Sequence, residues 1–337
     1  MNEVPKMPQN TKGFCFAPNT PLKLSLQEKP LRALNAGETL IQNLFVGLNP
    51  VDYKLLDSFS PKKAGQIMGV DGVGIALTSY PNQEHNPIKI GQIYAYHTDL
   101  RSDGSFSTYS IVRSSALMPL VASLPLHIAA SLPCPGLTAM QALHKVPLLT
   151  GRDVLVYGAG GALGRILLSL LVRQNARVSA VASKKHHSVL LAQGAWACYE
   201  YEEFCAQNLD SINGAIESVR NRFYAIFDTM GKASELVCLL GYYGHIVSIL
   251  GRIEENAVRA FTFCPSLHEI ALGAIHECGS EADFRRLRAQ GEELFSLVLS
   301  GEILLPDIQI IDFAEIPQAL SELKSAHLGR KFVAKVS

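Results

Sequence analysis

The pattern of hydrophobic and polar positions changes near residue 121 of this 337-residue chain. Before that point, short apolar runs at 38–46, 72–77 and 105–112 are separated by Gly, Pro and Asn, a pattern typical of strands in a compact, mostly-β unit. After it, short apolar runs alternate with helical patterns, which predicts a doubly wound parallel sheet. The strands expected in this second part are Val154–Tyr157, Arg177–Ala182, Ala225–Asp228 and Gly244–Ile249.

From about residue 271 the pattern changes again. An amphipathic helix through 294–299 is followed by a strand at 308–311, a helix from Pro317 and a final strand at 332–336. The length of the chain favours two domains, and the patterns together predict the α/β fold class.

Residues 151–165, GRDVLVYGAGGALGR, place four glycines between an expected strand and an expected apolar helix. Gly158, Gly160 and Gly164 give G-x-G-x-x-x-G, whereas Gly158, Gly161 and Gly164 give G-x-x-G-x-x-G. A strand-to-helix turn of bare backbone N–H groups can bind the pyrophosphate of a dinucleotide. A turn that only lets the helix pack closely on the sheet is the alternative.

The end of the next expected strand indicates which dinucleotide this turn would bind. A unit that binds NAD presents Asp or Glu there to the ribose 2′-hydroxyl, but this chain has Ser183, Lys184, Lys185, His186 and His187. Hydroxyl and cationic groups suit a 2′-phosphate, so the sequence favours NADPH. The alternative is that the lysines only solvate the start of a helix.

Composition excludes several classes of partner. Thirty basic residues balance thirty acidic ones, so no overall field favours nucleic acid or a membrane surface. No apolar run approaches the roughly 18 residues of a membrane span, and the seven cysteines form no C-x-x-C pair. We therefore expect a cytoplasmic protein with a small-molecule substrate and without a disulfide framework.

Seven motifs in order resemble the medium-chain dehydrogenase/reductase superfamily, and more closely its zinc-independent quinone oxidoreductase and enoyl (alkenal) reductase branch. The motifs are GLNPVDYK at 47–54, GVDGVG at 69–74, LPCPGLTA at 132–139, the glycine turn, GAW at 194–196 followed by Tyr201, FDTMG at 227–231 and GRKFV at 329–333. The resemblance implies a GroES-like catalytic domain (1–120 and 271–337) and a Rossmann domain (121–270). It also implies an active site in the interdomain cleft and a homodimer formed through an edge strand, for which Phe261–Phe263 is a candidate.

The chain departs from the zinc-dependent members of this superfamily. They place a cysteine early in the first motif and Gly-His-Glu in the second, where this chain has Gly47-Leu48-Asn49 and Gly69-Val70-Asp71, and the four-cysteine structural lobe is absent. We therefore expect no zinc, and hydride transfer from NADPH to a quinone or to an α,β-unsaturated carbonyl compound. A zinc-free alcohol dehydrogenase or carbonyl reductase and a non-catalytic NADPH-binding protein are the alternatives.

The resemblance also assigns catalytic residues. Asn49 would lie near the nicotinamide, Tyr53 would line the substrate pocket, and Lys54, if partly desolvated, could deliver a proton. The alternatives are that Tyr53 belongs to the core, that Lys54 is a solvated surface lysine, and that Asp52 only caps the helix that follows.

The expected cofactor contacts cover the whole dinucleotide. Thr138 would reach the nicotinamide end, or would serve only as a helix N-cap. Tyr201 would cover the adenosine end, or would be an ordinary tyrosine at a strand end. Gly329 and Lys331 match a tail motif near the cleft, but Lys331 could simply decorate the final strand. The remaining predicted contacts are Gly158, Gly161, Ala162 and Leu163 at the pyrophosphate, Ser183, Lys184 and His186 at the adenosine phosphate, and Ser248 and Leu250 at the nicotinamide edge.

Overall fold

The computed structural model describes residues 7–80, 88–121, 123–209, 222–325 and 329–336. These residues form two compact units. Unit 1 comprises residues 1–134, 273–299 and 307–337, and unit 2 comprises 135–272 and 300–306. The ranges expected for folding domains, 1–120 with 271–337 and 121–270, stay a prediction.

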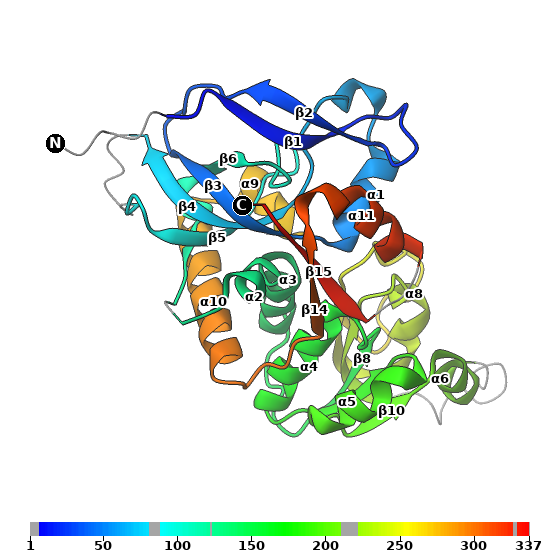
Figure 1. Ribbon diagram of the computed structural model, residues 1–337. Coiled ribbons are helices and arrows are strands. Elements are labelled where there is room, and N and C mark those ends of the chain that lie inside the picture. The colour runs from blue at the N-terminus through cyan, green and yellow to red at the C-terminus, as the bar shows by residue number, and fades with distance from the viewer. Residues whose placement is uncertain (1–6, 81–87, 122, 210–221, 326–328, 337) are drawn as a thin grey trace. The chain divides into compact units, whose positions relative to one another are not determined.

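Unit 1 is built on a mixed seven-stranded sheet of order β14-β15-β3-β4-β5-β7, with β6 paired to β3 (Figure 1). The parallel pair β14-β15 joins the antiparallel remainder through β3, so a strand near the end of the chain lies beside one near its start. A separate antiparallel pair, β1 (Asn10–Phe16) and β2 (Leu24–Pro30), completes the unit's strands. The sheet strands are β3 Glu38–Gly47, β4 Asp71–Ser79, β5 Ile93–His97, β6 Tyr109–Arg113, β7 Met118–Pro119, β14 Asp307–Asp312 and β15 Arg330–Lys335.

Two helices of unit 1 from opposite ends of the chain pack side by side: α1 (Pro50–Ser58) and α11 (Ile316–Ser325). Leu56 of α1 and Ile316 and Leu320 of α11 belong to one buried core, and Lys324 adds an ion pair to Asp57 of α1. Burial of these apolar side chains is the main source of stability for the contact. The other helices are α2 Leu126–Ala130, α9 Ile275–Cys278 and α10 Glu281–Leu299, with 3₁₀ turns at Pro61–Lys63, Ser114–Ala116 and Phe313–Glu315.

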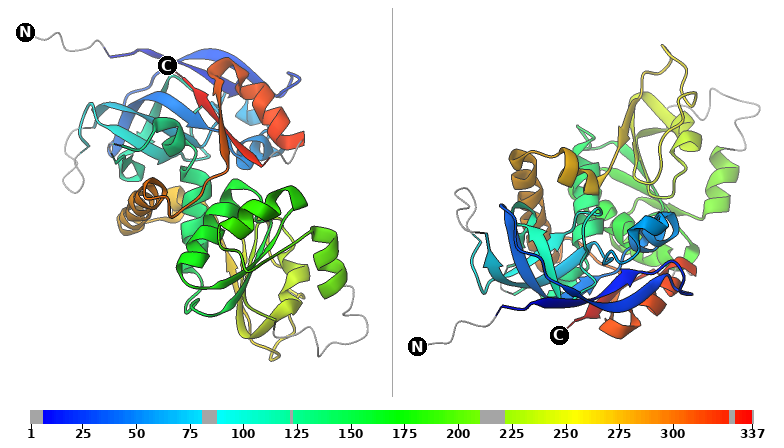
Figure 2. Two further views of the ribbon diagram at one scale, coloured as in Figure 1. Left: turned by 60° about the horizontal axis from the view of Figure 1, so that its bottom comes forward. Right: turned by 90° about the horizontal axis from the view of Figure 1, so that it is seen from above.

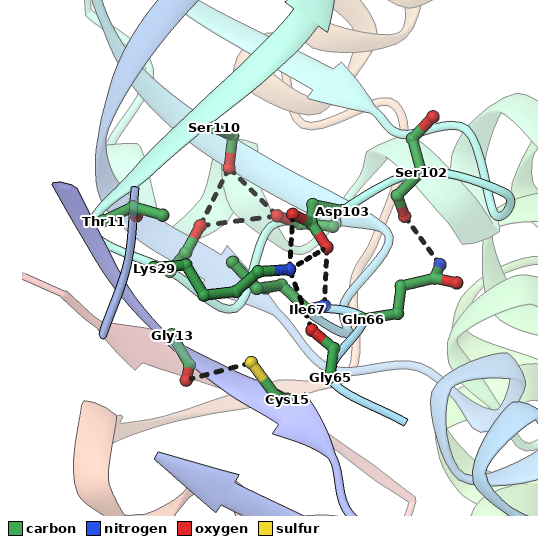
Figure 3. A network of polar contacts seen from close by, with 12 residues as sticks. Thr11, Gly13, Cys15, Lys29, Gly65, Gln66, Ile67, Ser102, Asp103 and Ser110 are labelled. Carbon is green, nitrogen blue, oxygen red and sulfur yellow. Dashed lines mark hydrogen bonds and ion pairs between the residues drawn. The ribbon is translucent and has the colours of Figure 1, made fainter. Parts of the chain in front are cut away.

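A polar network fixes the segment that leads into β4 (Figure 3). Lys29 of β2 donates to the carboxylate of Asp103 (2.9 Å) and to the carbonyl of Gly65 (2.8 Å), and Asp103 also accepts from the backbone N–H of Ile67 (2.8 Å). Gln66 donates to the carbonyl of Ser102 (2.7 Å). These contacts join residues 65–67, which lie just before β4 and its first residue Asp71, to the loop at 102–103.

Unit 2 contains a six-stranded sheet of order β10-β9-β8-β11-β12-β13, in which every neighbouring pair is parallel. Counted within the unit, this is the 3-2-1-4-5-6 order of dinucleotide-binding sheets, and the order reverses between β8 and β11. Its elements run from green to yellow in Figure 2. The strands are β8 Asp153–Tyr157, β9 Arg177–Val181, β10 Ala197–Tyr199, β11 Phe223–Asp228, β12 Leu240–Ser248 and β13 Ser266–Glu269.

The helices of unit 2 follow its strands in alternation, as expected for parallel strands joined by crossovers. α4 (Ala162–Arg173) follows β8 and has the most continuously buried face of these helices. The first helix, α3 (Pro133–His144), begins just before the boundary between the units. The others are α5 His187–Ala192, α6 Tyr201–Asn208 and α8 Ala233–Leu236, with 3₁₀ turns at Lys184–His186, Val237–Leu239 and Leu272–Ala274.

The predicted fold class is confirmed: one part of this α/β chain is mostly β, and the other contains a parallel sheet. The strand expected at 105–112 was wrong in its first half, because β6 begins only at Tyr109. Residues 105–107 instead bond to the chain around Gly69: Ser105 N–H donates to the carbonyl of Gly69 and Phe106 N–H to that of Met68. Among the residues described, no helix is both long and apolar enough to span a membrane.

Candidate functional site

The carboxyl ends of the parallel strands in unit 2 carry nearly all the residues predicted to bind a cofactor. The glycine turn follows β8, Ser183 follows β9, Tyr201 follows β10, and Ser248 ends β12. Because β8 and β11 are neighbours at the point where the strand order reverses, the turn borders the crevice where such sheets bind ligands.

Three of the four glycines in the turn are required by the protein itself. Gly158 has a φ of 93°, in the left-handed region that favours glycine. A Cβ on Gly160 would lie 2.5 Å from Cδ2 of His186, and one on Gly164 would lie 2.6 Å from the carbonyl oxygen of Gly158. These glycines therefore serve the turn and the close packing of α4, which was the alternative explanation for the motif.

Gly161 is different, because nothing in the protein requires it to be glycine. It is exposed, its φ of −80° is open to any residue, and a Cβ there would meet no atom within 4 Å. It is the N-cap of α4, and Ala162 and Leu163 form the first turn, where backbone N–H groups have no acceptor within the helix. The absence of a side chain at Gly161 thus leaves the backbone N–H groups at the start of α4 accessible to a ligand.

The residues after β9 divide into two groups. Ser183 and Lys184 are exposed, so a hydroxyl and an ammonium are available to a ligand. His186 is buried, and its Nδ1 lies 3.1 Å from the guanidinium of Arg165. Burial, reinforced by the positive charge of Arg165, lowers the pKa of His186 below its ordinary value. His186 therefore packs under the glycine turn, in its neutral form at pH 7.

The other predicted contacts in unit 2 are spread over several elements. Tyr201 begins α6, and its half-buried ring packs edge-on against that of Tyr157, with centroids 5.3 Å apart. Thr138 is buried within α3, past the first turn, so the alternative that it caps the helix was wrong. Ser248 is buried and donates to the carbonyl of Gly251 (3.1 Å), whereas Leu250 is partly exposed.

Asp228, at the end of β11, is a structural residue that sequence reasoning did not single out. Its buried carboxylate accepts from the backbone N–H groups of Met230 (2.8 Å) and Lys232 (2.6 Å). It therefore orders the loop that follows β11, on the β11 side of the crevice. The motif FDTMG contained the signal, since Asp before a glycine-containing turn commonly caps backbone donors.

Unit 1 gathers a buried polar cluster around Asn49, the N-cap of α1. Its side-chain Nδ2 donates to Oδ2 of Asp71 (2.8 Å), its Oδ1 accepts from the ammonium of Lys331, and its backbone N–H donates to Oδ2 of Asp52 (2.7 Å). The backbone N–H of Cys134 also donates to Oδ2 of Asp71 (3.0 Å). Asp52 therefore caps the start of α1, as the sequence analysis proposed for it.

The charges of this cluster, which we call the Asn49 cluster (Asn49, Asp52, Asp71, Cys134 and Lys331), perturb one another. Burial raises the pKa of Asp52 to about 8 and that of Asp71 to about 6, although Lys331 opposes both shifts. Burial lowers the pKa of Lys331, and it raises that of the Cys134 thiol. Of the two carboxyl groups, Asp71 therefore ionises at the lower pH, next to the side chain of Lys331 that opposes its shift.

The structure does not bring Tyr53 and Lys54 into the Asn49 cluster. Tyr53 is half-buried on α1, where burial raises its pKa and Lys324 and Asp57 are the charges that act on it. Lys54 is exposed, although partial burial of its ammonium lowers its pKa. Their catalytic roles stay predictions, as does that of Asn49.

Lys331 and Asp71 are the functional candidates that sequence reasoning underrated. Lys331 is buried, although it alternates with exposed Arg330 at the start of an apparently ordinary final strand. The signal was the position of this lysine directly before the apolar run Phe332–Ala334 of β15. Within the described ranges, no three His, Cys, Asp or Glu residues are grouped so that they could hold a metal ion.

Comparison with known proteins agrees with this architecture, although no family model matches the chain. A probable quinone oxidoreductase of Schizosaccharomyces pombe is 27% identical over 199 residues, 58% of this chain and 59% of that protein. The trans-enoyl reductase tndF of Aspergillus flavipes is 26% identical over 200 residues, 55% of this chain and 57% of that protein. The matches thus span little more than half the length of these relatives.

A solved structure extends the likeness to nearly the whole chain. The quinone oxidoreductase from Coxiella burnetii has a TM-score of 0.80 at 22% sequence identity, and the superposition covers 97% of this chain and all of that one. At this identity the comparison shows a shared fold.

Proposed function

We propose that this chain is a zinc-independent, NADPH-dependent oxidoreductase of the medium-chain dehydrogenase/reductase superfamily, and that it transfers hydride to a quinone or to an α,β-unsaturated carbonyl compound. The observation that carries the proposal is Gly161. The protein's own packing and backbone do not require glycine there, but a ligand that lies against the backbone does.

The residues around Gly161 fit a nicotinamide dinucleotide. Backbone N–H groups of Gly161, Ala162 and Leu163 would hold the pyrophosphate at the positive end of the α4 dipole. Exposed Ser183 and Lys184 follow the neighbouring strand, where their hydroxyl and ammonium would bind a 2′-phosphate. The preference for NADPH rests on these two residues and on the absence of a carboxylate from 183–187.

When bound, the dinucleotide would supply the hydride. The protein would stabilise the negative charge that develops on the substrate oxygen, and we assign that task to Tyr53, with Lys54 as the proton donor. The lowered pKa of Lys54, caused by partial burial of its ammonium, favours release of its proton. Asn49 would act by fixing the start of α1, because its side-chain amide is already bonded to Asp71 and Lys331.

The proposal of zinc independence is supported by the residues present in the Asn49 cluster. The ammonium of Lys331 is held against Asn49 and acts electrostatically on both Asp52 and Asp71. A divalent cation entering this cluster would be repelled by that buried positive charge. The matched relatives carry names of quinone oxidoreductase and trans-enoyl reductase, which supports the substrate classes chosen.

The test is oxidation of NADPH, followed by its near-ultraviolet absorbance, with a quinone, a 2-alkenal and a saturated ketone in parallel. NADH and a chelator serve as controls. We expect turnover of the quinone or the alkenal with NADPH, unchanged by the chelator. Turnover of the ketone alone would identify a carbonyl reductase, loss of activity with chelator would overturn zinc independence, and NADPH binding without turnover would indicate a non-catalytic protein.

A further inference from the structure

Arg165 places a guanidinium beneath the glycine turn. It lies in the first turns of α4 and is only 8% exposed, and its Nε donates to the carbonyl oxygen of Gly160 (3.3 Å). Sequence analysis assigned this residue no function. Arginine is seldom buried to this extent unless its donors have defined partners, so its contacts identify what it holds.

His186 is the second partner of this guanidinium. Its Nδ1 lies 3.1 Å from Nη2 of Arg165, and because a guanidinium can only donate, Nδ1 must accept. His186 therefore carries its ring proton on Nε2 when it makes this contact. The ring also lies so close to Gly160 that a Cβ there would be 2.5 Å from Cδ2.

These contacts determine the direction of the next peptide N–H. The described peptide bonds are trans, and in a trans peptide the carbonyl of Gly160 and the N–H of Gly161 point in opposite directions. Since Arg165 draws the carbonyl inward, beneath the turn, the N–H of Gly161 is directed outward. A Cβ on Gly161 would also meet no atom within 4 Å, so the backbone at this residue is open to a ligand.

We propose that Arg165 and His186 are positioning residues that hold the Gly160–Gly161 peptide with its N–H directed at the pyrophosphate of the dinucleotide. This inference rests on the proposed function. It differs from the predicted direct contact of His186 with the adenosine phosphate, because both side chains act from beneath the turn through the carbonyl of Gly160.

Affinity for two dinucleotides separates this role from recognition of the 2′-phosphate. Arg165→Met should weaken binding of NADPH and NAD⁺ by the same factor, about tenfold, since both contain the pyrophosphate and about one hydrogen bond is lost. Arg173→Met is the matched control. It removes an exposed arginine at the other end of α4, where Arg173 forms an ion pair with Glu302. Dissociation constants come from calorimetric titration of each variant, and thermal unfolding without ligand checks that it is folded.

Variants of His186 test the acceptor. Asn places an amide oxygen close to the position of Nδ1, so His186→Asn should bind NAD⁺ like the wild type, whereas His186→Leu should bind about tenfold more weakly. The amide resonance of Gly161 in ¹H–¹⁵N spectra should shift in Arg165→Met. It should also shift further in His186→Leu than in His186→Asn, because both variants remove the ring current of the imidazole but only leucine also removes the acceptor for Arg165. This readout needs no catalysis and remains usable where a variant is less stable.

A pH profile distinguishes positioning from direct contact. The charged groups that act on His186 are Arg165 of α4, Lys185 of its own turn and His187 of α5. Protonation of His186 removes the acceptor and places two cations together. The affinity of the wild type for NAD⁺, which has no 2′-phosphate, should therefore fall as the pH drops through the lowered pKa of His186. It should stay level in His186→Asn.

Three results would overturn the inference. The first is a folded Arg165→Met variant that binds the dinucleotides as tightly as Arg173→Met does, and the second is a His186→Asn variant that binds NAD⁺ as weakly as His186→Leu does. The third is tighter binding of NAD⁺ in acid, which would mean that His186 touches the phosphate directly. A wild-type protein that binds neither dinucleotide would overturn the proposed function as well, so the two failures are distinguishable.

Discussion

At the scale of single residues, identical amino acids in one turn have different reasons to be there. Gly160 makes room for the ring of His186, whereas a Cβ on Gly161 would have no neighbour within 4 Å. The glycine motif could be recognised in the sequence. The different role of each glycine could not, because the spacing of glycines does not reveal which side chain packs against each.

Adding a side chain at Gly161 should separate binding from stability. We expect Gly161→Val to weaken NADPH binding by more than about tenfold, because the side chain would occupy the space left for the pyrophosphate. Thermal unfolding should change little. Gly160→Ala should instead destabilise the fold by about 1–3 kcal/mol, because its Cβ would collide with His186. Fluorescence titration and thermal melts of both variants give the comparison, and equal loss of stability would contradict it.

Lys184 should determine the preference between dinucleotides. Replacing it by methionine removes an exposed ammonium after β9, so the affinity for NADPH should fall about tenfold while that for NADH stays the same. Arg173→Met supplies the control for loss of one positive charge from unit 2. Unaltered NADPH affinity in Lys184→Met would show that the lysine only solvates the start of the following helix.

At the scale of elements, the sequence predicted strands well wherever apolar residues formed a continuous run. β8, β9 and β11 lie close to their expected positions, whereas the segment before β6 alternates like a strand yet bonds to the loop around Gly69. The Asn49 cluster could not be predicted as a unit. Asn49 and Lys331 are 282 positions apart, and neither local pattern indicates that α1 and β15 meet.

The buried carboxyl of Asp52 should make stability depend on pH. Its pKa in the folded protein is about 8, above the ordinary 3.8, so its stabilising contribution is complete below about pH 4 and is lost as the pH rises toward 8. Between pH 5 and pH 8.5 the wild type should lose on the order of 2 kcal/mol more unfolding free energy than Asp52→Asn, whose amide stays neutral.

Urea unfolding at the two pH values measures this difference. Asp57→Asn makes the same change at an exposed position of α1, where Lys324 and Lys23 lower the pKa of the carboxyl instead. It should not reduce the loss of stability at high pH. An identical pH dependence in the wild type and Asp52→Asn would mean that Asp52 is ionised in the folded protein throughout this range.

At the scale of the whole molecule, the two units differ in how the chain contributes to them. Unit 2 comes almost entirely from one continuous stretch, whereas unit 1 combines three separate stretches. The change in hydrophobic pattern near residue 121 predicted two architectures. It could not predict that residues 300–306 belong to unit 2, because this short segment has no hydrophobic periodicity of its own. Pairings between stretches this distant depend on tertiary packing, which hydrophobic patterning does not encode.

Removing the chain after Ser325 should affect unit 1 selectively. It deletes β15, which lies between β14 and β3 and supplies Lys331 to the Asn49 cluster. We expect hydrogen exchange of β3 and β4 to accelerate, because β3 loses a neighbour and a buried charge loses its partner. Mass spectrometry of peptides from the truncated chain measures this, and full protection in both strands would contradict the expectation.

The bond between Lys331 and Asn49 also has a consequence for biosynthesis. At translation rates of about 5–20 residues per second, Asn49 emerges from the ribosome roughly 14 to 56 s before Lys331. During that interval the first strands of unit 1 have neither β15 beside them nor an ammonium to balance Asp71, while the strands of unit 2 are synthesised in one run. We therefore expect the parallel sheet to fold on the nascent chain first, with the earlier-synthesised strands completing their sheet later, an order that protease digestion of ribosome-stalled chains would reveal.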